Sequence, residues 1–173
     1  MNPQVVTEAF APLVGKPAYL VQKGLGSFVT MEFGEPSLYI REPAKGLPGR
    51  LVSVQGEWHL WIYCCSWRVT KEGTLVAHSE SSDKEIEEAM RFLDGQCIES
   101  VYVHPDCSTT FEFDLGGVME TQPYEPGTDD EQWYLYEPGE TVFSLRGDGT
   151  YDRSFGATPP DEIEWVPLWG GES

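Results

Sequence analysis

Residues 82–95 read SDKEIEEAMRFLDG, and this stretch carries the signals of one complete amphipathic helix. Ser82 and Glu85 form the pattern of a capping box, in which each side chain accepts a hydrogen bond from the other residue's backbone N–H. Apolar residues then recur at the spacing of a single helix face, and Gly95 follows as a C-terminal stop. These residues are Ile86, Ala89, Met90 and Leu93.

The same pattern occurs 80 residues earlier in the chain. The corresponding apolar positions and closing glycine are Val6, Ala9, Phe10, Leu13 and Gly15. Asn2 and Pro3 read as an N-cap and a first-turn proline, and Pro12 should shorten the last turn. Two strand-like motifs also recur, the second after a contraction of five residues. They are Thr30 to Phe33 with Thr110 to Phe113, and Trp58 to Trp61 with Trp133 to Tyr136. The sequence therefore predicts an internal duplication.

Short alternating runs rich in β-branched and aromatic residues follow each helix, as is typical of antiparallel strands. In the first half they are residues 18–22, 28–33, 37–41, 58–63, 67–70 and 75–78. In the second half they are residues 97–104, 109–113, 118–121, 132–136 and 141–146, with a last run near Tyr151. We predict an α+β fold made of two helix-plus-meander repeats, 1–80 and 81–154, packed as one compact pseudo-twofold unit. Residues 155–173 form a tail rich in Trp, Pro and acidic residues, either strapped over the core or docked elsewhere.

The two halves differ most in charge. Residues 1–86 hold 8 basic and 9 acidic residues, a net charge of −1, whereas residues 87–173 hold 3 and 20, a net charge of −17. A basic loop at residues 43–50 corresponds to an acidic loop at residues 125–131. The negative electrostatic field of the acidic half disfavours direct binding to nucleic acid or an anionic membrane, and it attracts a basic protein.

Strand alternation separates two faces in the paired Trp motifs. Trp58, Leu60, Trp133 and Leu135 are expected in the core because their types recur. The opposite face then carries His59, Trp61, Tyr63, Tyr134 and Tyr136. This aromatic face is either a binding surface or a second face covered by the tail or the other half. If this face is a binding surface, the acidic residues that precede Tyr134 in the sequence would form its rim. The candidate partner-binding residues are therefore Asp129, Asp130, Glu131, Tyr134, Tyr136, Trp61 and His59.

Catalytic and metal-binding patterns are weak. The sequence has no Gly-x-Ser-x-Gly elbow, no phosphate loop and no His-Glu-x-x-His motif. Its three histidines and four cysteines lack metal-ligand spacing, so we expect no metal, no cofactor and reduced thiols. The group around His104 and Cys107 reads as a hairpin turn, and Glu32 and Glu112 read as solvent-facing strand residues. Met1 to Gln4 lack a signal-peptide start, so we expect a cytoplasmic protein.

In size, acidity and lack of catalytic motifs, the chain resembles small bacterial immunity proteins, which neutralise a toxin by direct binding. That resemblance covers no motif. It implies a non-enzymatic module that binds a basic partner such as a toxin. Two alternatives stay open: a small-ligand-binding protein or enzyme that uses the aromatic face with His59, and a structural subunit of a homo-oligomer.

Overall fold

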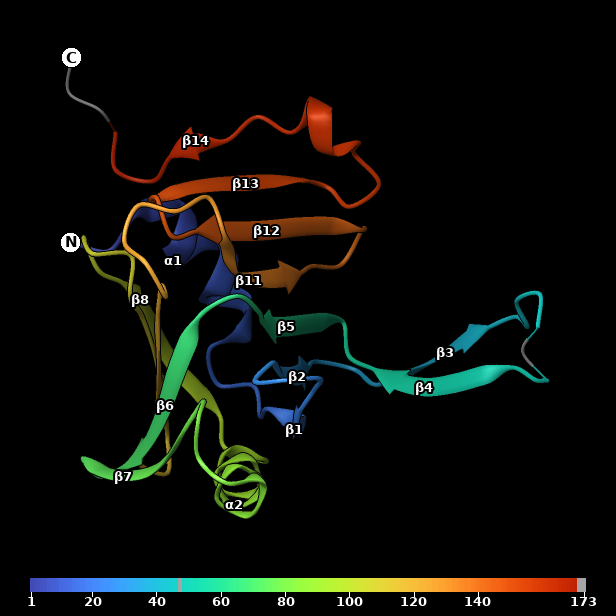
Figure 1. Ribbon diagram of the computed structural model, residues 1–173, viewed down its shortest axis with the longest axis horizontal. Helices are drawn as coiled ribbons and strands as arrows, with labels where there is room; N and C mark the ends of the chain where they lie inside the picture. Colours follow the sequence, from blue (N-terminus) through green and yellow to red (C-terminus); the bar gives the residue numbers. More distant parts are fainter. Residues whose placement is uncertain (47, 171–173) are drawn as a thin grey trace.

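The computed structural model describes residues 1–46 and 48–170. Within them the chain has an α+β architecture, with two helices and three β-sheets in which every pairing is antiparallel (Figure 1). The α+β class predicted from the sequence is confirmed. No helix in this part of the chain is long and apolar enough to cross a membrane.

The larger sheet has seven strands drawn from both ends of the chain. In spatial order they are β1 (Tyr19–Lys23), β2 (Val29–Phe33), β5 (Trp58–Ile62), β11 (Glu131–Tyr136), β12 (Thr141–Arg146), β13 (Thr150–Phe155) and β14 (Val166–Pro167). At its centre β5 pairs with β11, which places Leu60 opposite Leu135. This pairing joins the first predicted repeat to the second.

The second sheet has five strands and lies across the first in Figure 1. In order they are β7 (Thr74–His78), β6 (Ser66–Lys71), β10 (Gly117–Gln122), β9 (Thr109–Phe113) and β8 (Ile98–Val103). Each predicted repeat therefore contributes strands to both sheets. A separate hairpin of β3 (Ser37–Arg41) and β4 (Leu51–Gln55) projects from the body, and we call it the arm.

Helix α2 (Asp83–Leu93) begins with the predicted capping box. The Ser82 side chain accepts a hydrogen bond from the Glu85 N–H, and the Glu85 carboxylate accepts one from the Ser82 N–H. The helix ends before Gly95, whose φ of +87° is in the left-handed region. It packs against β1 and β7, which are edge strands of the two sheets. This helix therefore closes one side of the core.

Helix α1 (Gln4–Phe10) is shorter than α2, and a 3₁₀ turn (Ala11–Leu13) containing Pro12 continues it. The predicted effect of Pro12 is confirmed. The prediction that Asn2 caps this helix is wrong, because its side chain instead donates to the Val101 carbonyl and accepts from the Val103 N–H. Asn2 thereby ties the start of the chain to β8.

The core lies between the two sheets and is strongly aromatic around Trp133. That residue is fully buried, its indole N–H donates to Thr109 Oγ1, and its ring contacts Phe10 and Phe143 edge-on. Leu60 and Leu135 are also fully buried, as predicted. Trp58 is only partly buried, because it is the first residue of β5. The Lys16 ammonium lies over its ring.

Candidate functional site

An aromatic strip crosses the middle of the seven-stranded sheet on the face away from the core. Side chains alternate along a strand, so burying Leu60 and Leu135 turns their neighbours to the other side. The strip consists of Phe28, His59, Trp61, Tyr63, Tyr134 and Tyr136. The structure thus brings together the five residues predicted for this face, four of which were candidate partner-binding residues, and it adds Phe28.

The rings of the strip form one continuous set of contacts. Trp61 and Tyr134 are paired in register across β5 and β11, with ring centroids 5.6 Å apart. Tyr63 contacts both of these rings. Phe28 extends the set at one side, its ring centroid 4.7 Å from that of Tyr63, and the His59 ring meets that of Tyr136 at the other. A surface of this length can offer a large, rigid contact area.

Solvent reaches the strip, because its side chains are half-buried and Tyr136 is 37% exposed. The C-terminal segment follows a different course. It adds β14 to the edge of the sheet and buries Leu168 against the core. Of its two tryptophans, Trp165 lies over the Arg146 guanidinium, with 3.5 Å between the group and the ring centroid. Up to residue 170, the tail therefore packs along the edge of the sheet and does not cover the strip.

One end of the strip carries a partly buried hydrogen-bonded contact between an imidazole and a carboxylate. His59 Nδ1 lies 2.5 Å from Glu32 Oε1, and the other oxygen of Glu32 accepts a hydrogen bond from the Gly56 N–H. Glu32 is 6% exposed, so the expectation that it faces solvent is wrong. The reason is the approach of Gly56 and His59, which shield it. Glu112 on β9 is exposed, as expected, and accepts a hydrogen bond from Ser100.

The acidic loop, residues 125–131, lies at the opposite end of the strip. Two backbone hydrogen bonds hold it against the β12–β13 turn: Gly127 N–H donates to the Gly147 carbonyl, and Gly147 N–H donates to the Asp130 carbonyl. Asp129 and Asp130 are exposed, whereas the Glu131 carboxylate lies 3.4 Å from Arg146 Nη2. The predicted acids thus border the aromatic strip at the Tyr63 and Tyr134 end.

The surroundings of Tyr134 and Tyr136 favour the neutral form of both phenols. Burial raises the pKa of Tyr134 well above its ordinary value, and the Glu131 carboxylate raises it further. Burial also raises the pKa of Tyr136. A neutral phenol keeps its O–H as a hydrogen-bond donor, which suits these side chains to contact with a partner's acceptors.

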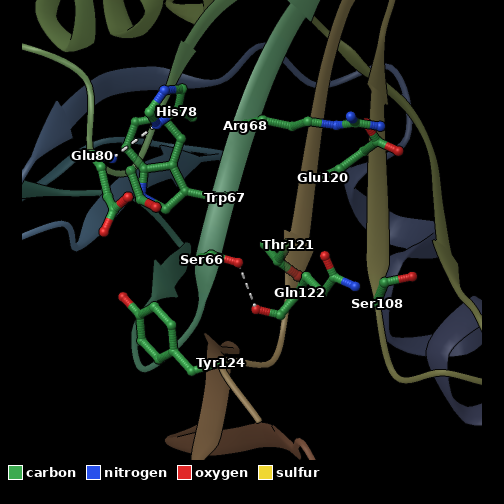
Figure 2. Close-up of a pocket in the computed structure, with 11 residues that line it drawn as sticks. Ser66, Trp67, Arg68, His78, Glu80, Ser108, Glu120, Thr121, Gln122 and Tyr124 are labelled. Carbon is green, nitrogen blue, oxygen red and sulfur yellow. Dashed lines mark hydrogen bonds and ion pairs between the residues drawn. The ribbon is translucent and has the colours of Figure 1, made fainter. Parts of the chain in front are cut away.

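A pocket of about 540 Å³ lies on the other sheet, where residues of the paired strands β6 and β10 line it (Figure 2). In Figure 2, Arg68 and Glu120 point toward each other across these strands, while Trp67, His78 and Tyr124 lie on the other side of β6. His78 Nδ1 accepts a hydrogen bond from the Glu80 N–H, which fixes it in the turn. This pocket shares no residue with the aromatic strip.

The cysteines and histidines form no recognisable reactive centre in the described residues. No group of three or more His, Cys, Asp or Glu there is placed to hold a metal ion. All four cysteines are unpaired. Burial and the nearby Asp106 raise the pKa of Cys107, the opposite of what an activated thiolate needs. His104 and Cys107 lie in the β8–β9 turn, and His104 bonds to Thr110.

The chain was compared with models of known protein families, with curated proteins and with solved structures, and none of the three comparisons gave a match.

Proposed function

We propose that this chain is a non-enzymatic protein-binding module that holds a basic protein partner, such as a toxin, on the aromatic strip. The acidic loop serves as the rim of that site. The observation that carries this proposal is the open, continuous strip of six aromatic or imidazole rings on one sheet face, with acids at its end.

The aromatic strip has the composition of a binding centre. Tyr and Trp dominate the energetics of protein interfaces because they bury a large area while losing little side-chain entropy. The strip is also rigid, since each ring contacts a neighbour and the underlying strands are central to the sheet. Binding a partner there would cost little ordering of the protein surface.

The acidic loop supplies the charge that selects the partner. Asp129 and Asp130 are exposed beside the strip, in the half of the chain with a net charge of −17. Exposed charges at a rim mainly increase the association rate and make it sensitive to salt. Phosphate groups and anionic lipids would be repelled by the same field.

We also infer that the chain arose by duplication and that its two halves then diverged for binding. The support is the common order of elements, with Gly15 and Gly95 both in the left-handed region after the helices. The halves differ where the third strand lies. In the first half β3 leaves the body as part of the arm, whereas β10 at the offset of 80 residues stays in a sheet.

We also propose that the protein works in a reducing compartment such as the cytoplasm, because its four cysteines are unpaired.

The experiment that tests this function is affinity capture from the source cell, followed by binding kinetics with the purified, captured protein. We expect a basic protein whose dissociation is faster from Tyr134→Ala and Tyr136→Ala. The double variant Asp129→Asn with Asp130→Asn should slow association mainly at low salt. Tyr102→Ala is the matched control, because Tyr102 on β8 has nearly the same exposure as Tyr136, 36% against 37%.

Equal kinetics for the strip variants and the Tyr102 control would contradict the assignment of the strip as the binding centre. Unchanged salt dependence in the Asp129 and Asp130 double variant would contradict the role of the acidic loop.

A further inference from the structure

The arm exposes more apolar surface than any role within one chain explains. All ten residues of β3 and β4 are exposed, and within the described part of the chain these strands pair only with each other. Figure 1 shows the arm extending well away from the two sheets. A two-stranded hairpin is marginally stable alone in water, and its open edges invite pairing.

One face of the arm is entirely aliphatic. In the register of the hairpin, Leu38 lies opposite Val54 and Ile40 lies opposite Val52, and directly opposed residues share a face. These four side chains are 66%, 42%, 54% and 57% exposed, respectively. The other face carries Ser37, Tyr39, Arg41, Leu51, Ser53 and Gln55. The arm is thus amphipathic, with its apolar face turned to solvent.

The aliphatic face runs into a groove at the base of the arm. This groove has a volume of about 540 Å³, and Val54 belongs both to the groove and to the aliphatic face. Its apolar lining includes Tyr19, Leu20 and Pro36. Together the face and the groove form one continuous apolar surface.

Charge is polarised along the arm. Arg41, Lys45 and Arg50 lie at or near its tip, and with Glu42 they give residues 37–55 a net charge of +2, against −20 for the rest of the chain. Glu35 and Glu57 line the groove at the base together with Lys16, whose ammonium lies over the Trp58 ring, so two acids and one base give the groove a net negative charge. A second arm laid antiparallel to the first would therefore bring each basic tip to the acidic base of the other copy.

We propose that the arm is a self-association surface. Two copies of this chain dock with their arms side by side and antiparallel. The aliphatic faces pack against each other, and each basic tip reaches the groove of the other copy. A twofold axis satisfies both contacts at once, because the surface is complementary to itself. A foreign partner would have to match the apolar face and both ends of the charge gradient.

The area available is adequate for a specific dimer. Four aliphatic side chains about half exposed, with the groove residues and the tip, offer on the order of 600 Å² per copy, near the roughly 800 Å² per partner of a standard interface. The proposal does not depend on the aromatic strip, because no residue of the strip belongs to the arm or the groove.

The test is the molar mass in solution, measured by light scattering and sedimentation over a range of protein concentrations. We expect the mass to rise from one chain to two with concentration. Ile40→Asp with Val52→Asp buries two uncompensated charges, so the dissociation constant should rise by roughly 100-fold or more. Tyr39→Asp with Ser53→Asp adds the same charge to the opposite face of the same hairpin and is the matched control.

A charge exchange tests the pairing of tip and base. Arg41→Glu with Lys45→Glu reverses the tip, and Glu35→Lys reverses part of the base. Glu57 is kept, because its carboxylate accepts a hydrogen bond from the Glu35 N–H. Each variant alone should dimerise more weakly than the wild type, and the two mixed should associate more tightly than either alone. A wild-type chain that stays monomeric at every concentration, or equal dimerisation by the two Asp variants, would overturn the proposal.

Discussion

Trp61 of β5 lies directly opposite Tyr134 of β11, with their ring centroids 5.6 Å apart. These residues are 73 positions apart in the sequence and belong to different predicted repeats. Their pairing makes the aromatic strip continuous, because Tyr63 contacts both rings and Tyr136 contacts that of Tyr134. The candidate site is therefore a product of how the two halves of the chain join.

The first prediction compares two tryptophans that the sequence analysis treats as equivalent. Trp133→Ala should lower the free energy of unfolding by about 3–5 kcal/mol, because a fully buried ring and its hydrogen bond to Thr109 are lost. Trp58→Ala should cost only about 1.5 kcal/mol, since its ring is only partly buried. Urea denaturation measures both, and equal losses would contradict their different burial.

The second prediction concerns the two glutamates of the repeated Thr-x-Glu-Phe motif. Glu32→Ala should cost about 2 kcal/mol, because it leaves the Gly56 N–H and the His59 ring without their partner in a partly buried position. Glu112→Ala is the matched control and should change stability by no more than about 0.5 kcal/mol, as expected for an exposed side chain. A similar cost for both would mean that the Glu32 contacts contribute nothing to stability.

The third prediction follows from the raised pKa of Tyr134. In the unfolded chain this phenol ionises near pH 10, whereas in the folded protein it keeps its proton to higher pH. Between these two pKa values the folded state binds more protons, so stability must fall as pH rises above about 10. Tyr134→Phe should reduce the slope of that loss, measured by denaturation at several alkaline pH values. The same slope in this variant and the wild type would show that Tyr134 ionises normally.

Much of the local structure was predictable from the sequence. The capping box at Ser82 and Glu85 and the stop at Gly95 are local signals, and α2 follows them. Alternation along β5 and β11 also separates the core leucines from the aromatic side chains, because successive side chains of a strand point to opposite faces. Five of the six strip residues could thus be predicted from the pattern alone, whereas Phe28, which precedes β2, could not. Two strands were missed: residues 51–55, LVSVQ, form β4 beyond the basic loop, and Val166–Pro167 form β14 within the predicted tail.

Sheet membership was decided only by the tertiary structure. Local patterns fix which residues are extended but not which strands pair, so nothing in the sequence indicates that β5 joins β11 while β6 joins β10. The burial of Glu32 is a similar case. It depends on the close approach of Gly56, where a Cβ would lie 2.3 Å from the Phe33 carbonyl oxygen, and on the neighbouring His59.

The arm shows the same division between sequence and tertiary structure. The residue pattern alone indicates that residues 37–41 are extended and that the loop after them is basic. Only the packing decided that this hairpin leaves the sheet, because β5 takes the place next to β2 and no edge is left there for β3. Long-range strand pairing is a competition among all strands of the chain, and its outcome is not encoded in any one segment.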